Sequence, residues 1–75
     1  MNFISDHAEL LLVYYEVLNE WEGIDEFYKE QSDAEKRAEE FAKESNSEFF
    51  TFVYQVRIIQ DGNRIYTMSY CLKHF

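Results

Sequence analysis

The sequence of 75 residues has no proline, two glycines and a single cysteine. One cysteine excludes an internal disulfide framework, and so few glycines leave no glycine-rich loop for phosphates. No apolar run approaches the roughly 20 residues of a membrane span, and no basic segment precedes an apolar one as in a signal peptide. We therefore expect one soluble domain over residues 1–75, located in the cytoplasm.

Basic residues are also few. Seven Lys and Arg oppose fifteen Asp and Glu, so the formal net charge is −8. Fourteen of the acids and four of the bases lie in residues 1–48, whereas residues 49–75 hold one acid and three bases. A field of this sign repels nucleic acids and anionic membranes. We expect no direct binding to either, and a basic protein surface as the partner.

Apolar residues, in contrast, are plentiful at 47%, and aromatic residues make up 19%. This is enough to build a core, so the acidic chain is not predicted to be disordered. A chain this short buries only about 60% of its unfolded surface, which leaves little room for a water-excluding pocket beside the core. A binding protein is therefore favoured over an enzyme.

The last third of the chain predicts a β-hairpin, because two runs rich in β-branched and aromatic residues flank Gln60–Asn63. A three-residue loop over Asp61–Asn63 places Ile58 opposite Tyr66 and makes one face wholly apolar or aromatic. We expect that face to form the core. The opposite face is also apolar and is predicted to be a homodimer surface, made by Phe49, Val53, Ile59, Ile65 and Phe75.

The middle of the chain predicts a helix from Asp33 to Ser45. Ser32 and Glu35 have the spacing of a capping box, and Asn46 is a suitable C-terminal stop. Small and apolar residues recur at helical spacing, which allows the helix to lie close to a sheet; they are Ala34, Ala38, Phe41, Ala42 and Ser45.

The first third has two interpretations. Residues 10–18 are rich in residues that favour a strand, and residues 24–29 are able to pair back on them. The same region also carries a capping-box pattern at Asp6 and Glu9 and an apolar helical stripe. The predicted fold is α+β, an antiparallel sheet of about four strands with one helix on one face, in the order β-β-α-β-β. The alternative is α-α-β-β.

One acidic cluster stands apart from the compensated charges of the helix. Trp21 lies within it, and a large aromatic with a charged rim is typical of a partner-binding anchor. The predicted partner-binding residues are Glu20, Trp21, Glu22, Asp25 and Glu26. The alternative is a solubilising loop whose Trp21 is folded into the core.

No catalytic, cofactor or metal site is predicted. Cys71 and His74 are three residues apart, which places them on opposite faces of a strand, and His7 is remote in sequence. Glu16 is the one acid inside an apolar run, so we expect it to be partly desolvated. The simpler interpretation of Glu16 is a strand residue that points outward.

In its size, its acidic first half and its predicted sheet with one helix, the chain resembles small acidic proteins that phages encode against host defences. These include anti-CRISPR proteins and DNA mimics. The resemblance implies stoichiometric binding that blocks a host nucleic-acid-binding protein, in the host cytoplasm, without turnover. The second hypothesis is a homodimeric structural or accessory subunit whose charge only maintains solubility.

Overall fold

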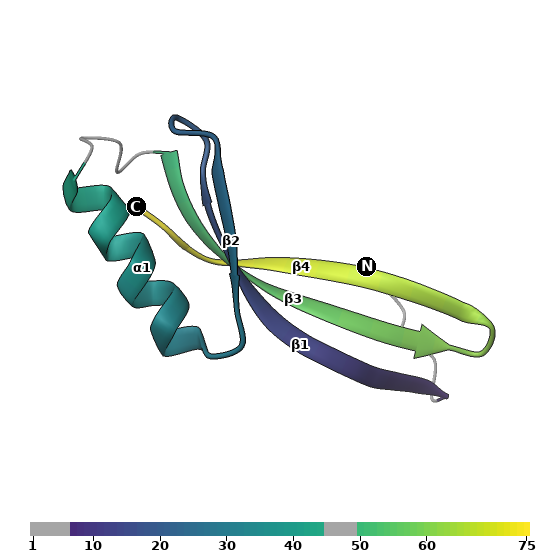
Figure 1. Ribbon diagram of the computed structural model, residues 1–75. Helices are drawn as coiled ribbons and strands as arrows, with labels where there is room; N and C mark the ends of the chain where they lie inside the picture. Colours follow the sequence, from purple (N-terminus) through teal and green to yellow (C-terminus); the bar gives the residue numbers. More distant parts are fainter. Residues whose placement is uncertain (1–6, 45–49) are drawn as a thin grey trace.

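The computed structural model describes residues 7–44 and 50–75, which form one sheet and one helix. The elements are β1 (Ala8–Asn19), β2 (Ile24–Tyr28), α1 (Gln31–Glu44), β3 (Thr51–Asp61) and β4 (Arg64–His74). All neighbouring strands are antiparallel, in the order β2-β1-β3-β4 (Figure 1). The predicted α+β fold with the order β-β-α-β-β is confirmed. At 14 residues and with many charges, α1 is neither long nor apolar enough to cross a membrane.

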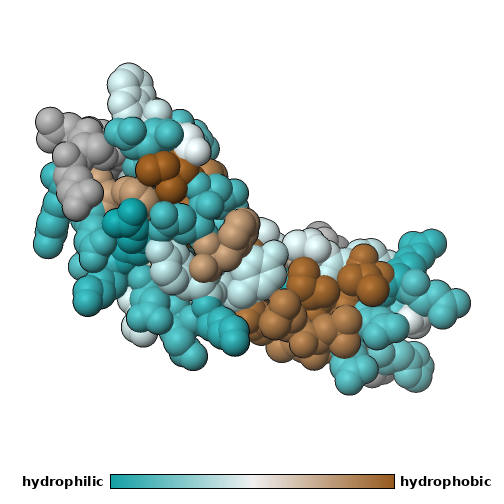
Figure 2. Space-filling view, in the orientation of Figure 1, coloured by the Kyte–Doolittle hydropathy of each residue, from teal (hydrophilic) through white to brown (hydrophobic). Residues whose placement is uncertain are grey.

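The helix covers only one end of the sheet, and β1, β3 and β4 continue past it (Figure 1). We call this continuation the arm; it comprises residues 8–13, 56–61 and 64–70. The molecule is accordingly elongated, with extents of 44 × 23 × 17 Å. Hydrophobic surface gathers along the arm, whereas the helical end is largely hydrophilic (Figure 2). The arm includes several exposed large apolar residues, among them Leu10, Leu11, Leu12, Ile65 and Tyr66.

The core lies between α1 and the covered end of the sheet. Val17 of β1 and Val53 of β3 are opposite each other and fully buried. Ala34 and Ala38 of α1 are fully buried against them, and Phe41 is nearly so. Small side chains on both layers allow the helix to approach closely. The predicted helical stripe is confirmed for Ala34, Ala38 and Phe41; Ala42 is half-buried, and Ser45 lies outside the described residues. Four partly buried residues pack against the edge of this core; they are Tyr15, Ile24, Tyr28 and Phe75.

The expected dimer surface is not a continuous exposed face. Val53 is fully buried beneath α1, and Phe75 packs against the core. Ile59 is buried as well, whereas Ile65 is exposed on the arm. Phe49 lies outside the described residues. The physical reason lies directly beneath the alanines of α1, where the covered face presents Val17 and Val53. On the other face, the residues next to Val53 in β3 are Phe52 and Tyr54, whose rings would hold the alanines away.

The register of the β3–β4 hairpin also differs from the prediction. The turn has two residues, Gly62 and Asn63, and Ile58 pairs with Thr67 rather than with Tyr66. Gly62 has φ 62°, the left-handed conformation that two-residue hairpin turns need at their first position. One further irregularity follows, because Tyr54 pairs with Cys71 and Val53 with Lys73, which leaves Leu72 as a bulge.

Helix α1 begins two residues earlier than predicted. The carbonyl of Glu30 accepts a hydrogen bond from the N–H of Ala34 at 3.2 Å, which makes Glu30 the N-cap residue. Ser32 therefore lies inside the helix, and the predicted capping box is wrong. The Glu35 carboxylate instead accepts a hydrogen bond from the side-chain amide of Gln31 at 3.0 Å. The predicted stop at Ser45 and Asn46 lies outside the described residues.

Candidate protein-binding surface

The turn between β1 and β2 is held by a buried polar pair. Asn19 and Thr51 are fully buried, and the amide nitrogen Nδ2 of Asn19 donates to Oγ1 of Thr51 at 2.8 Å. The Oδ1 of Asn19 accepts the backbone N–H of Glu22, also at 2.8 Å. One side chain thus ties the turn to the neighbouring strand β3. The backbone N–H of Glu20 adds a bond to the carbonyl of Phe50 at 3.0 Å.

Trp21 sits on this fixed turn with its side chain in solvent. The residue is 69% exposed, so the alternative in which it folds into the core is wrong. Its ring lies 5.5 Å from that of Phe50, measured between centroids, and Phe50 is itself 40% exposed. Two aromatic rings are therefore held together at the surface, where burial by a partner would remove a large apolar area from water.

Three carboxylates lie within four residues of Trp21 in the sequence. Glu20 and Glu22 flank Trp21 in the turn, Asp25 follows in β2, and all three are exposed. We call the set Glu20, Trp21, Glu22, Asp25 and Phe50 the acidic–aromatic turn. The structure thus brings together four of the five predicted partner-binding residues.

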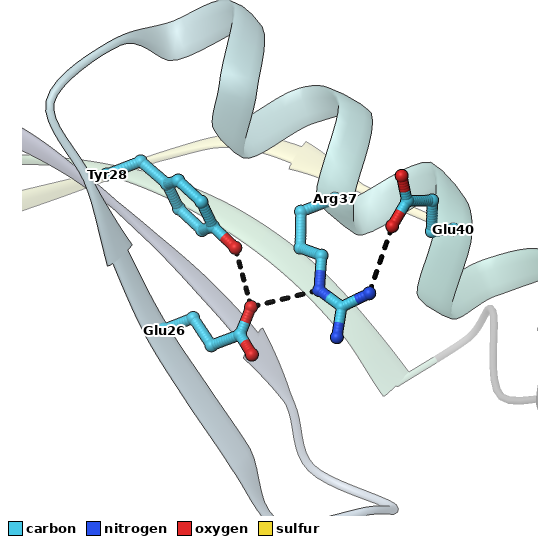
Figure 3. Close-up of polar contacts among 4 residues, drawn as sticks. All are labelled: Glu26, Tyr28, Arg37 and Glu40. Atoms are coloured by element: carbon cyan, nitrogen blue, oxygen red, sulfur yellow. Dashed lines mark hydrogen bonds and ion pairs between the residues drawn. The ribbon is translucent and has the colours of Figure 1, made fainter.

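Glu26, the fifth, lies on the other side of the sheet. It is opposite Val17, so its side chain points toward α1. Its Oε1 accepts hydrogen bonds from the Tyr28 hydroxyl at 2.6 Å and from Nε of Arg37 at 3.0 Å (Figure 3). Nη1 of Arg37 also donates to Oε2 of Glu40 at 3.0 Å (Figure 3).

This network joins β2 to α1 and compensates the charge of Glu26. The hydrogen bonds from Tyr28 and Arg37 lower the pKa of Glu26, so it stays ionised. The pKa of Tyr28 is raised, first by burial and then by its bond to Glu26. The guanidinium of Arg37 also lies 4.1 Å above the ring of Phe41. Glu26 therefore serves the attachment of the helix and is not part of the acidic–aromatic turn.

Glu16 lies on the helix-free face of the sheet, next to the turn. It is opposite Phe27 and Tyr54, which makes Asp25 its diagonal neighbour on β2. Burial, then the hydrogen bond to Asp25 and its charge, raise the pKa of Glu16 to about 7. The expected desolvation of Glu16 is confirmed. Burial also raises the pKa of Tyr54, with smaller contributions from Cys71, Glu20 and Glu16.

The arrangement is suited to contact rather than to metal binding. Among residues 7–44 and 50–75, no three His, Cys, Asp or Glu side chains are grouped so that they could hold a metal ion. Cys71 is an exposed free thiol on the helix-free face, not a packed apolar residue. The exposed carboxylates of the turn instead offer oxygen acceptors that match Lys and Arg side chains.

Two members of this surface were missed by sequence reasoning. Phe50 carries no local signal, because it meets Trp21 only through the pairing of β1 with β3. Asn19 does carry a local signal, because an Asn directly before a turn is a frequent side-chain cap for that turn. In comparisons with known proteins, no protein-family model, no curated protein and no solved structure matches this chain.

Proposed function

We propose that the protein is a stoichiometric binding protein whose acidic–aromatic turn occupies the basic surface of a nucleic-acid-binding protein and blocks it. This is the mode of action implied by its resemblance to phage-encoded inhibitors and DNA mimics. The observation that carries the proposal is the exposure of Trp21, held at the surface beside Phe50 within a group of carboxylates.

Three physical features support the proposal: an exposed tryptophan, a turn that is already fixed in the free protein, and a negative net charge. Tryptophan is among the residues that contribute most to binding when a partner desolvates them, and a rigid turn loses little entropy on binding. The net charge of −8 attracts a basic partner over a distance and speeds encounter. The hydrogen bonds of Asn19 hold the turn in place before any partner arrives.

The test is affinity capture from a bacterial lysate with three baits, eluted in salt steps and identified by mass spectrometry. The baits are the wild type, the variant E20Q/E22Q/D25N, and the control variant E30Q/E35Q/E39Q. The control removes the same number of charges from the helical side of the molecule. We expect the wild type and the control to retain a basic nucleic-acid-binding protein that moderate salt releases.

The E20Q/E22Q/D25N bait should lose that protein, and Trp21→Ala should weaken its retention at least tenfold, as is usual for a central aromatic anchor. Equal loss from both charge variants would mean that only net charge attracts the partner and that the acidic–aromatic turn is not the binding site. Recovery of no basic protein by any bait would contradict the proposed function.

A further inference from the structure

Within residues 7–44 and 50–75, strand β4 is an edge of the sheet and has no neighbour on its outer side (Figure 1). It runs for 11 residues, is exposed at every position except the half-buried Met68, and contains no proline. Ile65 is 66% exposed, and Tyr66, Tyr70 and Leu72 are also exposed. A long apolar edge of this kind is a template for another strand.

The turn determines which backbone groups of β4 are available. Asp61 pairs with Arg64 next to the two-residue turn, and in such a hairpin the pair beside the turn exchanges two hydrogen bonds. Alternate pairs along the ladder do the same. The N–H and C=O groups of the intervening residues point away from β3, toward the open edge; these residues are Ile65, Thr67, Ser69 and Cys71.

The four residues whose backbone groups face the open edge lie symmetrically about Met68. The hairpin turn precedes the first of them, and the bulge at Leu72 follows the last. An antiparallel copy of β4 placed about a twofold axis at Met68 pairs every member of the set. Ile65 then faces Cys71 of the second copy, and Thr67 faces Ser69. Each such pair exchanges two backbone hydrogen bonds.

We propose that the protein dimerises by pairing the β4 edges of two copies about a twofold axis at Met68, which joins their sheets. The side chains agree with this register, because Tyr66 is placed opposite Tyr70 of the second copy and the small Thr67 opposite Ser69. The same twofold axis sets Met68 opposite its own copy, in a pair without hydrogen bonds.

The distribution of charge is compatible with the pairing of two copies at β4. Two molecules of net charge −8 repel each other over most of their surfaces. Strand β4 contains Arg64 and Lys73 and no acid, so no two carboxylates of the paired strands meet across the axis. The other edge strand, β2, is short and carries Asp25 and Glu26, which protect it from pairing. No residue of the acidic–aromatic turn belongs to β4, so the two proposals rest on different residues and are independent.

A cysteine at the axis tests the register directly. Residues in a pair without hydrogen bonds have Cα atoms about 4.5 Å apart, within reach of a disulfide. We expect M68C/C71S to form a covalent dimer almost completely under mild oxidation. In the control T67C/C71S the two thiols are displaced by two residues, beyond about 7 Å, and cross-linking should be slight. No cross-linking of M68C/C71S, or equal cross-linking of both, would overturn the proposal.

A charge exchange at the same position supplies a second test, followed by sedimentation at hundreds of micromolar protein. The wild type should show twice the 9.1 kDa mass of one chain. Met68→Lys and Met68→Glu should each be monomeric, because like charges meet across the axis, and an equal mixture should recover the dimer. Circular dichroism establishes that each variant is folded. A monomeric wild type, or a mixture that stays monomeric, contradicts the pairing and leaves the edge for a strand of another protein.

Discussion

Trp21 is kept outside the core because the side chain of Asn19 fixes the turn that carries it. Without the hydrogen bonds of Asn19, the turn would be free to move, and the indole of Trp21 could fold back onto the apolar surface of the protein. Trp21 is 69% exposed, which costs free energy because apolar surface stays in contact with water. A partner that covers the ring of Trp21 beside Phe50 would remove this surface from water. The account of this surface therefore depends first on the position of one side chain.

The single tryptophan makes that position measurable in the free protein. We expect the fluorescence of Trp21 to have the long-wavelength emission of a solvated indole and to be quenched efficiently by acrylamide. The Asn19→Ala variant, which loses the bonds to Glu22 and Thr51, should shift the emission as the turn relaxes. A short-wavelength emission that resists acrylamide in the wild type would mean that Trp21 is buried.

Glu16 gives the fold a dependence on pH. Its pKa is raised from the ordinary 4.5 to about 7, so between these values the folded state binds more protons than the unfolded state. Stability must then fall as the pH rises through this window, and the cost is complete above about pH 7.

We predict that Glu16→Gln removes this cost. At pH 8 the variant should be more stable than the wild type by on the order of 1 kcal/mol, a value reduced for the partial exposure of Glu16. At pH 4 the two proteins should be equally stable. Denaturant titrations across this range measure the difference, with Glu39→Gln as an exposed control that keeps the wild-type profile. A wild type whose stability rises from pH 5 to pH 8 relative to Glu16→Gln would contradict the assignment.

At the scale of elements, α1 is attached by small side chains and one polar network. Ala34 and Ala38 permit close contact with Val17 and Val53, and Arg37 ties the helix to β2 through Glu26. The helix is short and strongly charged, so its own propensity contributes less than this packing.

Overpacking should therefore detach the helix. We predict that Ala38→Leu lowers the free energy of unfolding by about 1–3 kcal/mol, because the added atoms have no space between helix and sheet. The matched variant Glu39→Leu, at the next and exposed position, should change it by less than about 0.5 kcal/mol. Equal effects in urea denaturation would show that the helix does not pack on the sheet as described.

Local signals predicted the elements well but not their pairing. The alternation of residues 49–75 and the alanine stripe of residues 34–42 are enough to indicate the hairpin and the helix. The register was wrong because Asp61–Asn63 and Gly62–Asn63 are both reasonable turns and both sheet faces are rich in apolar residues. The prediction of which sheet face lies in the core was wrong for the same reason. Only the fit of Ala34 and Ala38 against Val17 and Val53 distinguishes the two faces.

At the scale of the whole molecule, acidic and apolar surfaces occupy different regions. Exposed carboxylates lie in the β1–β2 turn (Glu20, Glu22) and along α1 (Asp33, Glu39), whereas β4 contains no acid. On the face that Figure 2 shows, hydrophobic surface gathers on the arm. The acidic cluster could be predicted from the order of the residues around Trp21 alone. The departure of Glu26 toward Arg37 could not, because it depends on which face of β2 meets the helix.

The central claim is that the acidic–aromatic turn competes with nucleic acid for a basic protein. The most direct measurement is the fluorescence anisotropy of a labelled nucleic acid bound to the protein recovered by affinity capture, titrated with this chain. The account predicts that the anisotropy falls to the value of the free nucleic acid at about one equivalent, and that Trp21→Ala requires a large excess. A nucleic acid that stays bound at saturation, or displacement by Trp21→Ala equal to that by the wild type, would contradict it.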